Sequence, residues 1–179
     1  MTNRGKLILA IGIVLLLSAG GVAVVYFAAW KNRAQANAGA TLYAQLMALY
    51  AATEQQYGIP TDLLARQGFE ESSFLPDIIY GTETSSAGAQ GIAQFMPATA
   101  AQYGVSNPND PTQAIPGQGA YMAALYKQFG SWSLALAAYD AGPTAVTNAG
   151  PGVPNIPETQ NYVSQIITDV NAEGGAQVS

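Results

Sequence analysis

One carboxylate, Glu71, lies where the sequence pattern predicts an apolar side chain. Residues 61–75 have the spacing of a helix that begins at Thr61 and ends before Pro76. At about 100° per residue, Glu71 projects into the middle of an apolar stripe made of Leu63, Leu64, Phe74 and Leu75. A half-buried carboxylate without a cationic partner has a raised pKa and stays protonated, as a general acid must. The pattern alone equally allows Glu71 to be a solvated residue on a helix face.

The neighbouring carboxylate, Glu70, falls at the edge of the same stripe. It follows Arg66 by one helical turn, so an i,i+4 ion pair can hold it at the surface. Of the two adjacent carboxylates, Glu71 is therefore the candidate acid.

The composition removes several kinds of catalysis. The chain has 179 residues and contains no Cys and no His. Cys-His and Ser-His-Asp nucleophiles are therefore impossible, and so are zinc sites built from thiolates or imidazoles. Carboxylates, hydroxyls, amides and aromatic rings remain. That set of groups suits the cleavage of glycosidic bonds, which needs carboxylic acids and surfaces that stack on sugars.

The charges are unevenly distributed along the chain. Of the six basic residues, only Arg66 and Lys127 come after position 33, whereas all eleven acidic residues lie at or after Glu54. Without a basic stripe to neutralise phosphates, the body is not expected to bind nucleic acid.

An apolar run without a charge extends from Leu7 to Trp30. As a helix rising about 1.5 Å per residue, it is long enough to cross a hydrocarbon core of about 30 Å. The alternative is a cleaved signal peptide, because small-residue cleavage patterns occur at 34–38, but the run is longer than a usual signal sequence. We therefore predict a transmembrane anchor at 1–30, a linker at 31–40 and a catalytic body at 41–179.

The body has helical periodicity and no convincing strand, so we predict an all-α domain with a long irregular connection after the candidate acid. The connection from Asp77 to Gly88 is polar and could hold a short hairpin. Besides the helix that carries Glu71, the expected helices are 41–57, 91–103, 119–129, 131–141 and 158–171.

Three segments carry a resemblance to a known family. They are Glu71-Ser72-Ser73-Phe74, the stretch 85–100 with Gly91-Ile92-Ala93-Gln94-Phe95-Met96-Pro97, and Ala137-Ala138-Tyr139-Asp140-Ala141-Gly142 followed by Pro157-Glu158-Thr159-Gln160-Asn161-Tyr162. In this order and at nearly this spacing, the chain from about 59 to 170 resembles the soluble lytic transglycosylase family. The resemblance implies a lysozyme-like α fold.

The resemblance also implies roles for individual residues. Glu71 matches the family's single catalytic acid/base. Ser85, Gln94 and Met96 would line the glycan cleft near the cleaved bond, while Tyr139, Asp140, Glu158 and Tyr162 would form its opposite wall. From the residues alone, Met96 is equally well explained as a packing residue, and Tyr139 is better explained as a buried ring with a satisfied hydroxyl. No metal and no cofactor is implied.

The sequence departs from the family pattern at two places. The segment 78–84 makes the chain longer between Glu71 and Ser85 and adds a carboxylate, Glu83. Asp140 stands where the family pattern has asparagine, and a negative charge close to Glu71 raises the pKa of that carboxyl group.

The implied substrate is peptidoglycan, cut between N-acetylmuramic acid and N-acetylglucosamine with formation of 1,6-anhydromuramyl ends. Two alternatives remain open. One is a hydrolytic muramidase in which Glu83, Asp77 or Asp140 supplies a second carboxylate, and the other is a membrane-anchored protein that docks on the wall without catalysis. The predicted anchor places the domain either at a bacterial inner membrane, facing the wall, or in the internal membrane of a phage virion.

Overall fold

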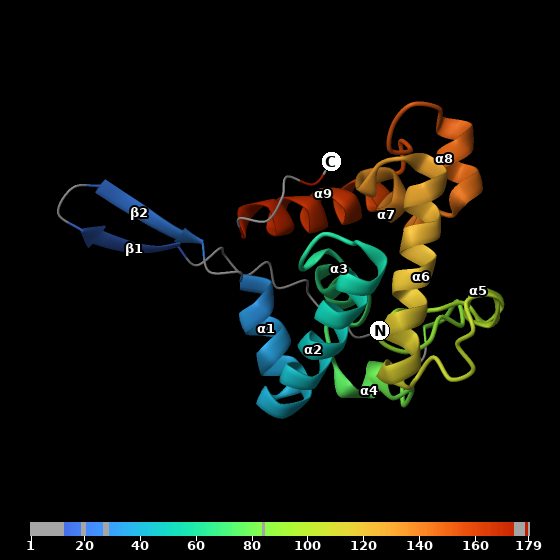
Figure 1. Ribbon diagram of the computed structural model, residues 1–179, viewed down its shortest axis with the longest axis horizontal. Coiled ribbons are helices and arrows are strands. Elements are labelled where there is room, and N and C mark those ends of the chain that lie inside the picture. The colour runs from blue at the N-terminus through green and yellow to red at the C-terminus, as the bar shows by residue number, and fades with distance from the viewer. Residues whose placement is uncertain (1–12, 19–20, 27–28, 84, 174–177, 179) are drawn as a thin grey trace, which may run out of the picture.

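The computed structural model describes residues 13–18, 21–26, 29–83, 85–173 and 178. Within these residues the body is all-helical, as predicted, and a two-stranded ribbon precedes it (Figure 1). The strands are β1 (Ile13–Ser18) and β2 (Gly21–Tyr26). The helices are α1 (Ala29–Ala38), α2 (Ala40–Tyr57), α3 (Leu63–Ser72), α4 (Pro76–Ile79), α5 (Pro97–Gln102), α6 (Pro111–Phe129), α7 (Trp132–Ala141), α8 (Pro143–Ala149) and α9 (Pro157–Ala172).

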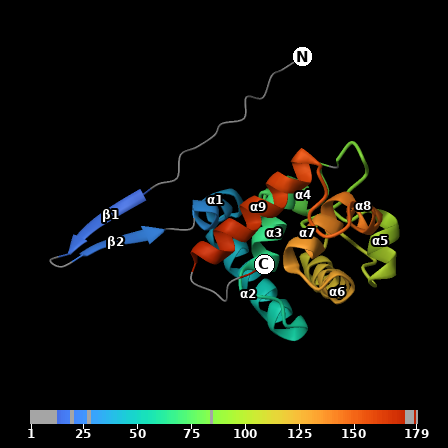
Figure 2. The same cartoon turned by 90° about the horizontal axis from the view of Figure 1, so that it is seen from above.

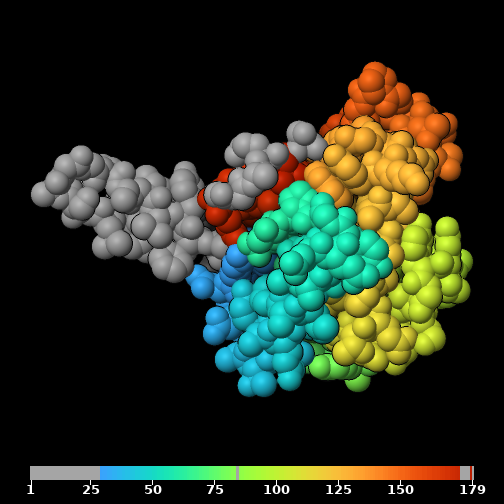
Figure 3. Space-filling model, in the orientation of Figure 1, coloured from blue at the N-terminus to red at the C-terminus, as the bar shows by residue number. Residues whose placement is uncertain are grey.

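Helix α3 lies at the centre of the body and is covered by α1, α2 and α9 (Figures 1 and 2). Every residue of α3 except Glu70 and Glu71 is buried. Helix α2 also packs along α6, and Figure 3 shows the two as one continuous surface on this face of the molecule. A helix buried on nearly all sides is held rigidly, so it can present a side chain in a fixed place.

The ends of α3 differ slightly from the sequence prediction. The helix begins at Leu63 and ends at Ser72, because Asp62, Ser73 and Phe74 adopt left-handed backbone conformations. Phe74 is fully buried, but Leu75, which we assigned to the apolar stripe, is 40% exposed. The change of backbone direction at Ser73 turns Leu75 away from the core.

Most of the segment 31–40, which we predicted to be a tether, belongs to helix α1, and α2 begins at Ala40. Trp30 and Ala34 are buried in the common core, and the Asn37 amide donates to the Ser73 carbonyl oxygen at 2.7 Å. An Ala- and Asn-rich sequence is typical of a linker, but alanine is also the residue with the highest helix propensity. Contacts between α1 and α3 favour the helix over the linker.

The apolar run predicted as one membrane-spanning helix is described only in part. Residues of β1 and β2 pair antiparallel, from Ile13 with Tyr26 to Ser18 with Gly21. Positions 7–12, 19–20 and 27–28 of the run lie outside the described residues. Where it is described before Ala29, the run is therefore strand and not helix.

The physical reason for this difference lies in the composition of the run. β1 and β2 contain Ile and several Val residues, and a β-branched apolar run fits a strand as well as a helix. In the part of the chain that the structure describes, no helix is both long and apolar enough to cross a membrane.

Four further helices differ from the sequence prediction. The stretch expected as one helix from Gly91 to Tyr103 is helical only in α5, and a turn closed by backbone pairing of Gln90 with Phe95 precedes it. Helix α6 begins eight residues before the expected start, because Asp110 caps it through the Thr112 amide. The short helices α4 and α8 were not predicted, and α4 opens the connection that was expected to hold a short hairpin; the described residues of that connection contain no strand.

Candidate active site

A cleft of about 620 Å³ opens between α3, α7 and α9. Its lining includes four of the predicted site residues, which come from three separate helices: Glu71 from α3, Asp140 from α7, and Glu158 and Tyr162 from α9. The other lining residues are Glu70, Asn161 and Gln165. The cleft is thus strongly acidic and polar, which suits a neutral polyhydroxylated ligand better than an anionic one.

Glu71 is half-buried and lines this cleft. Its Oε1 accepts a hydrogen bond of 2.6 Å from the Tyr162 hydroxyl. Burial raises the pKa of Glu71 to about 8, the Tyr162 hydrogen bond opposes this rise, and the charges of Asp140 and Glu70 add to it. Glu71 therefore holds its proton at neutral pH and can donate it.

Glu70 is paired, as the sequence analysis predicted. The Arg66 guanidinium lies 2.8 Å from Glu70 Oε2 and 2.7 Å from Asp169 Oδ2. Arg66 is buried, so it holds both carboxylates at the boundary between α3 and α9. Because its charge is compensated, Glu70 is not a second candidate acid.

Asp140 lies at the exposed rim of the cleft. Its Oδ2 accepts a hydrogen bond of 2.6 Å from the buried Thr159 hydroxyl of α9. It is close enough to raise the pKa of Glu71 through charge repulsion, the effect expected for aspartate in place of the family's asparagine.

Tyr139 does not line the cleft. Its hydroxyl donates to the Ala93 carbonyl oxygen at 2.6 Å, and its ring packs between Phe95 and Tyr121 at centroid distances of 6.3 and 5.1 Å. Tyr139 thus joins α7 to the turn that precedes α5. In this geometry the Tyr139 hydroxyl is satisfied and the ring is packed, and its role at the substrate stays a prediction.

The remaining predicted residues, Ser85, Gln94 and Met96, lie on the irregular segment before α5 and outside the lining of the cleft. The Ser85 hydroxyl accepts from the Ala89 amide at 2.8 Å, which shapes the loop. Gln94 has a φ of 46° and its side chain donates to the Gly91 carbonyl oxygen at 2.8 Å. Met96 is 46% exposed. A strained polar residue beside an exposed thioether is typical of a ligand-facing turn.

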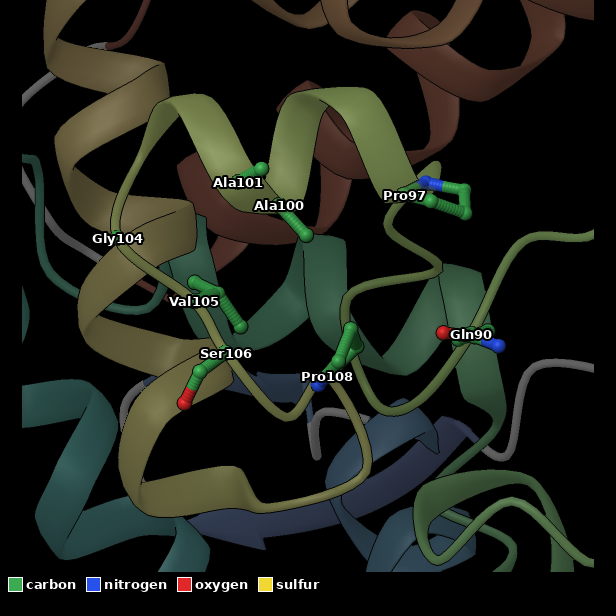
Figure 4. Close-up of a pocket in the computed structure, with 8 residues that line it drawn as sticks. All are labelled: Gln90, Pro97, Ala100, Ala101, Gly104, Val105, Ser106 and Pro108. Atoms are coloured by element: carbon green, nitrogen blue, oxygen red, sulfur yellow. The ribbon is translucent and has the colours of Figure 1, made fainter.

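A second cavity, of about 450 Å³, lies beside α5 (Figure 4). It is lined by Gln90, Pro97, Ala100, Ala101, Gly104, Val105, Ser106 and Pro108, and none of these eight side chains is ionisable. It offers no group that could protonate a leaving oxygen at neutral pH. Of these two cavities, only the cleft that contains Glu71 offers a carboxyl group that holds a proton at neutral pH.

Three residues in or beside the cleft were not predicted from the sequence: Asn161, Gln165 and Thr159. Asn161 and Gln165 line the cleft, and the Thr159 hydroxyl donates a hydrogen bond to Asp140 Oδ2. The spacing could have revealed the first two, because 158, 161, 162 and 165 share one face of a helix. No local signal pairs Thr159 with Asp140, since that contact depends on how α7 and α9 pack.

The hydrogen bond from Tyr162 favours the ionised form of Glu71 and so lowers its pKa. Tyr162→Phe removes this bond, so we expect the pKa of Glu71 to rise and the alkaline limb of the pH–activity profile to move upward by about one pH unit. It is also expected to lower kcat about ten-fold, since Glu71 loses the group that orients it. The measurement is kcat and kcat/KM against pH. Tyr126→Phe, on the exposed end of α6, is the matched control. An unchanged or downward-shifted limb in Tyr162→Phe contradicts the assignment of this contact.

Comparison with known proteins identifies the family. The profile of the family described as "Transglycosylase SLT domain" matches residues 48–159, more than half of the chain. The transglycosylase of Enterobacteria phage PRD1 is 35% identical over 120 residues, which cover 67% of this chain and 41% of that protein. Membrane-bound lytic murein transglycosylase F of Stutzerimonas stutzeri is 34% identical over 98 residues, covering 50% and 19%. The chain thus spans less than half the length of these relatives.

Solved structures show the same fold. The 70 kDa soluble lytic transglycosylase of Escherichia coli superposes with a TM-score of 0.61 at 23% identity, over 81% of this chain and 28% of that one. The lytic transglycosylase Slt of Pseudomonas aeruginosa, solved as an inactive mutant, gives a TM-score of 0.59 at 24% identity, over 69% and 23%. With the helical body, the acidic cleft and the family match together, this chain belongs to the Transglycosylase SLT domain family.

Proposed function

We propose that this protein is a lytic transglycosylase that cleaves the β-1,4 bond between N-acetylmuramic acid and N-acetylglucosamine in peptidoglycan. The names of the relatives, one a phage transglycosylase and one a lytic murein transglycosylase, support this activity. The observation that carries the proposal is Glu71, a half-buried carboxyl group with a raised pKa in a polar cleft.

In the proposed reaction Glu71 acts twice. Protonated Glu71 donates its proton to the glycosidic oxygen, and the bond from that oxygen to C1 of the muramyl residue breaks, assisted by the substrate's acetamido group. Ionised Glu71 then takes the proton of the muramyl 6-hydroxyl while that oxygen bonds to C1. The product is a 1,6-anhydromuramyl end, and Glu71 is protonated again without consuming water.

The residues around the cleft have proposed supporting roles. Tyr162 orients Glu71, while Asp140 and Glu158 face the substrate from α7 and α9. Ser85, Gln94 and Met96 would contact the glycan on the side of the turn before α5, and Tyr139 fixes that turn through Ala93. Neither a metal nor a cofactor takes part in the proposed chemistry.

The experiment that tests the proposal is a digest of purified peptidoglycan by the full chain, analysed by mass spectrometry. The expected fragments are lighter by one water than hydrolysis products and carry anhydromuramyl ends. Fragments with ordinary reducing ends would instead identify a muramidase. A folded protein that binds wall material and releases no fragment would leave wall docking as its function.

One observation favours the muramidase as the second candidate. Hydrolysis with a single general acid needs a second carboxylate, and Asp140 lies in the same cleft as Glu71. The other two candidates do not line that cleft: Asp77 is exposed and accepts from the Thr82 hydroxyl at 3.0 Å, and Glu83 is exposed on the same loop.

Asp140→Asn separates the two candidates. For the transglycosylase we expect anhydromuramyl products to persist. The alkaline limb of the pH profile should move down by about half a unit, because a screened negative charge near Glu71 is lost. The measurement combines product masses with activity against pH. If Asp140 were the second carboxylate of a muramidase, fragment release would fall by about two orders of magnitude or more.

The place of action is also part of the proposal. The charge-free residues that begin at Leu7 and precede α1 support a membrane anchor that holds the domain facing the cell wall, whereas Trp30, at the end of the run, packs in the core of the body. A bacterial inner membrane and the internal membrane of a phage virion both provide that position, and the relatives include a phage protein and a membrane-bound bacterial enzyme. Separation of the expressed chain into membrane and soluble fractions tests the anchor.

A further inference from the structure

A second buried carboxylate, Glu54, lies on α2 and takes no part in the chemistry described above. It is 5% exposed. Its Oε2 accepts from the Asp62 amide at 3.0 Å, and its Oε1 accepts from the Leu64 and Ala65 amides at 2.9 and 3.2 Å. These three amides belong to the first turn of α3 and the residue before it, so Glu54 caps the helix that carries Glu71.

Helix α3 depends on this cap because it lacks one of its own. Asp62, at the N-cap position, has a φ of 66° and makes no side-chain hydrogen bond to the helix. The first amides of a helix have no partner within the helix, and leaving buried amides unpaired is costly. A carboxylate from a neighbouring helix satisfies them and also interacts favourably with the positive end of the helix dipole.

The cap is geometrically coupled to the active site. Leu64 and Glu71 are seven residues apart, so they lie two turns apart on the same side of α3. One turn before Glu54 on α2, the Tyr50 ring packs against Gly68, where a Cβ would meet the Tyr50 oxygen at 1.9 Å. Glu54 therefore fixes α3 along its axis, and the close approach at Gly68 fixes its distance from α2.

We propose that Glu54 is a positioning residue for Glu71: through the three amides it sets where α3 begins, and thereby where Glu71 meets the glycosidic oxygen. This inference rests on the proposed transglycosylase function. It deepens that function by adding a residue on α2, which contributes nothing to the lining of the cleft.

Positioning by Glu54 depends on its ionised state. Burial raises the pKa of Glu54 to about 7, against the hydrogen bonds from the three amides. Two titratable groups lie beside Glu54: Tyr50 on the same helix, and Asp62 before α3. The Asp62 Oδ2 atom lies 2.7 Å from the Lys31 Nζ atom of α1, and Lys31 also forms an ion pair with Glu173. Below pH 7 the protonated oxygen accepts less well, so kcat should rise with pH through about 7 and fall above about 8 as Glu71 ionises.

The test is kcat and KM of the full chain against pH, with wild type and Glu54→Gln compared well below their melting temperatures. The amide keeps one acceptor oxygen and cannot ionise. We expect kcat of Glu54→Gln at pH 7.5 to be about ten-fold lower with little change in KM, and its acidic limb to vanish. At pH 5 the two proteins should be nearly equal, because protonated Glu54 resembles glutamine.

Thr53→Val is the matched control, since Thr53 is buried next to Glu54 but bonds only to the Leu49 carbonyl oxygen of its own helix. It should lower stability and leave the acidic limb in place. An acidic limb that persists in Glu54→Gln overturns the proposal. If that variant does not fold, the wild type decides, because a kcat constant between pH 5 and 7 overturns it as well.

A failure of the proposed transglycosylase function can be told apart from a failure of the proposed role of Glu54. If the wild type releases no fragments, hydrogen exchange at the Leu64 and Ala65 amides still measures the cap. Exchange about ten-fold faster in Glu54→Gln supports the role of Glu54 in holding α3, and unchanged exchange refutes it.

Discussion

Replacing Glu71 with glutamine is expected to lower the release of anhydromuramyl fragments at least about 10³-fold, because one group supplies both the acid and the base. The fold should be retained, since the glutamine oxygen can still accept from Tyr162. The measurement is the mass-spectrometric digest described above, together with circular dichroism of the variant.

The same variant has a pH-dependent effect on stability. The pKa of Glu71 is about 8 in the folded protein and 4.5 ordinarily, so wild-type stability falls as pH rises from about 4.5 through 8. Glutamine removes this loss. Glu71→Gln should therefore melt about 5 °C above wild type at pH 8.5 and at the same temperature at pH 4.5. A lower melting temperature at pH 8.5 would show that the charge of Glu71 is stabilised in the fold.

Glu70→Gln is the control for the loss of activity. Glu70 lines the same cleft and carries the same charge, but Arg66 compensates it. We expect at most a few-fold loss of activity, because its effect on Glu71 is electrostatic and minor. Equal losses from the two substitutions would refute the assignment of the acid to Glu71.

Trp30→Ala is expected to reduce the free energy of unfolding by about 3–5 kcal/mol, a large share of the stability of a typical domain. Trp30 is 4% exposed, its ring lies 5.9 Å from that of Phe69, and its Nε1 donates to Glu173 Oε1 at 2.7 Å. The substitution leaves a cavity between α1 and α3 and a partly buried carboxylate without this donor. Urea denaturation of the full chain measures the effect.

Gln35→Ala is the matched control within α1. Gln35 is exposed on the same helix, and alanine is a better helix former, so its effect should lie within about 0.5 kcal/mol. If Trp30→Ala also changed the free energy of unfolding by no more than about 0.5 kcal/mol, α1 would be a tether on the surface and not a part of the core. That outcome would restore the linker predicted for 31–40.

Part of the candidate site could be predicted from sequence. The pairing of Arg66 with Glu70 is a property of a single helix, which has a fixed period. The apolar stripe around Glu71 was only partly correct, because α3 ends at Ser72 and Leu75 is exposed, so the choice of Glu71 as the acid also needed the family resemblance. The positions of Tyr139 and Ser85 relative to the cleft could not be predicted. They depend on how α7 and the segment before α5 pack, and a turn at Gly91 replaced the first half of an expected helix.

The sequence by itself determined the all-helical body, the candidate acid, the exclusion of thiol and imidazole chemistry, and the ion pair of Glu70. The helical body, the exclusion and the ion pair follow from composition, helical periodicity and contacts within one turn of a helix, whereas the choice of Glu71 as the acid also needed the family resemblance. Only the tertiary structure decided that α1 belongs to the core, that Tyr162 bonds to Glu71 across 91 positions, and that Glu54 caps α3. Such contacts join helices whose mutual packing no local period encodes, so they appear only when the chain is folded.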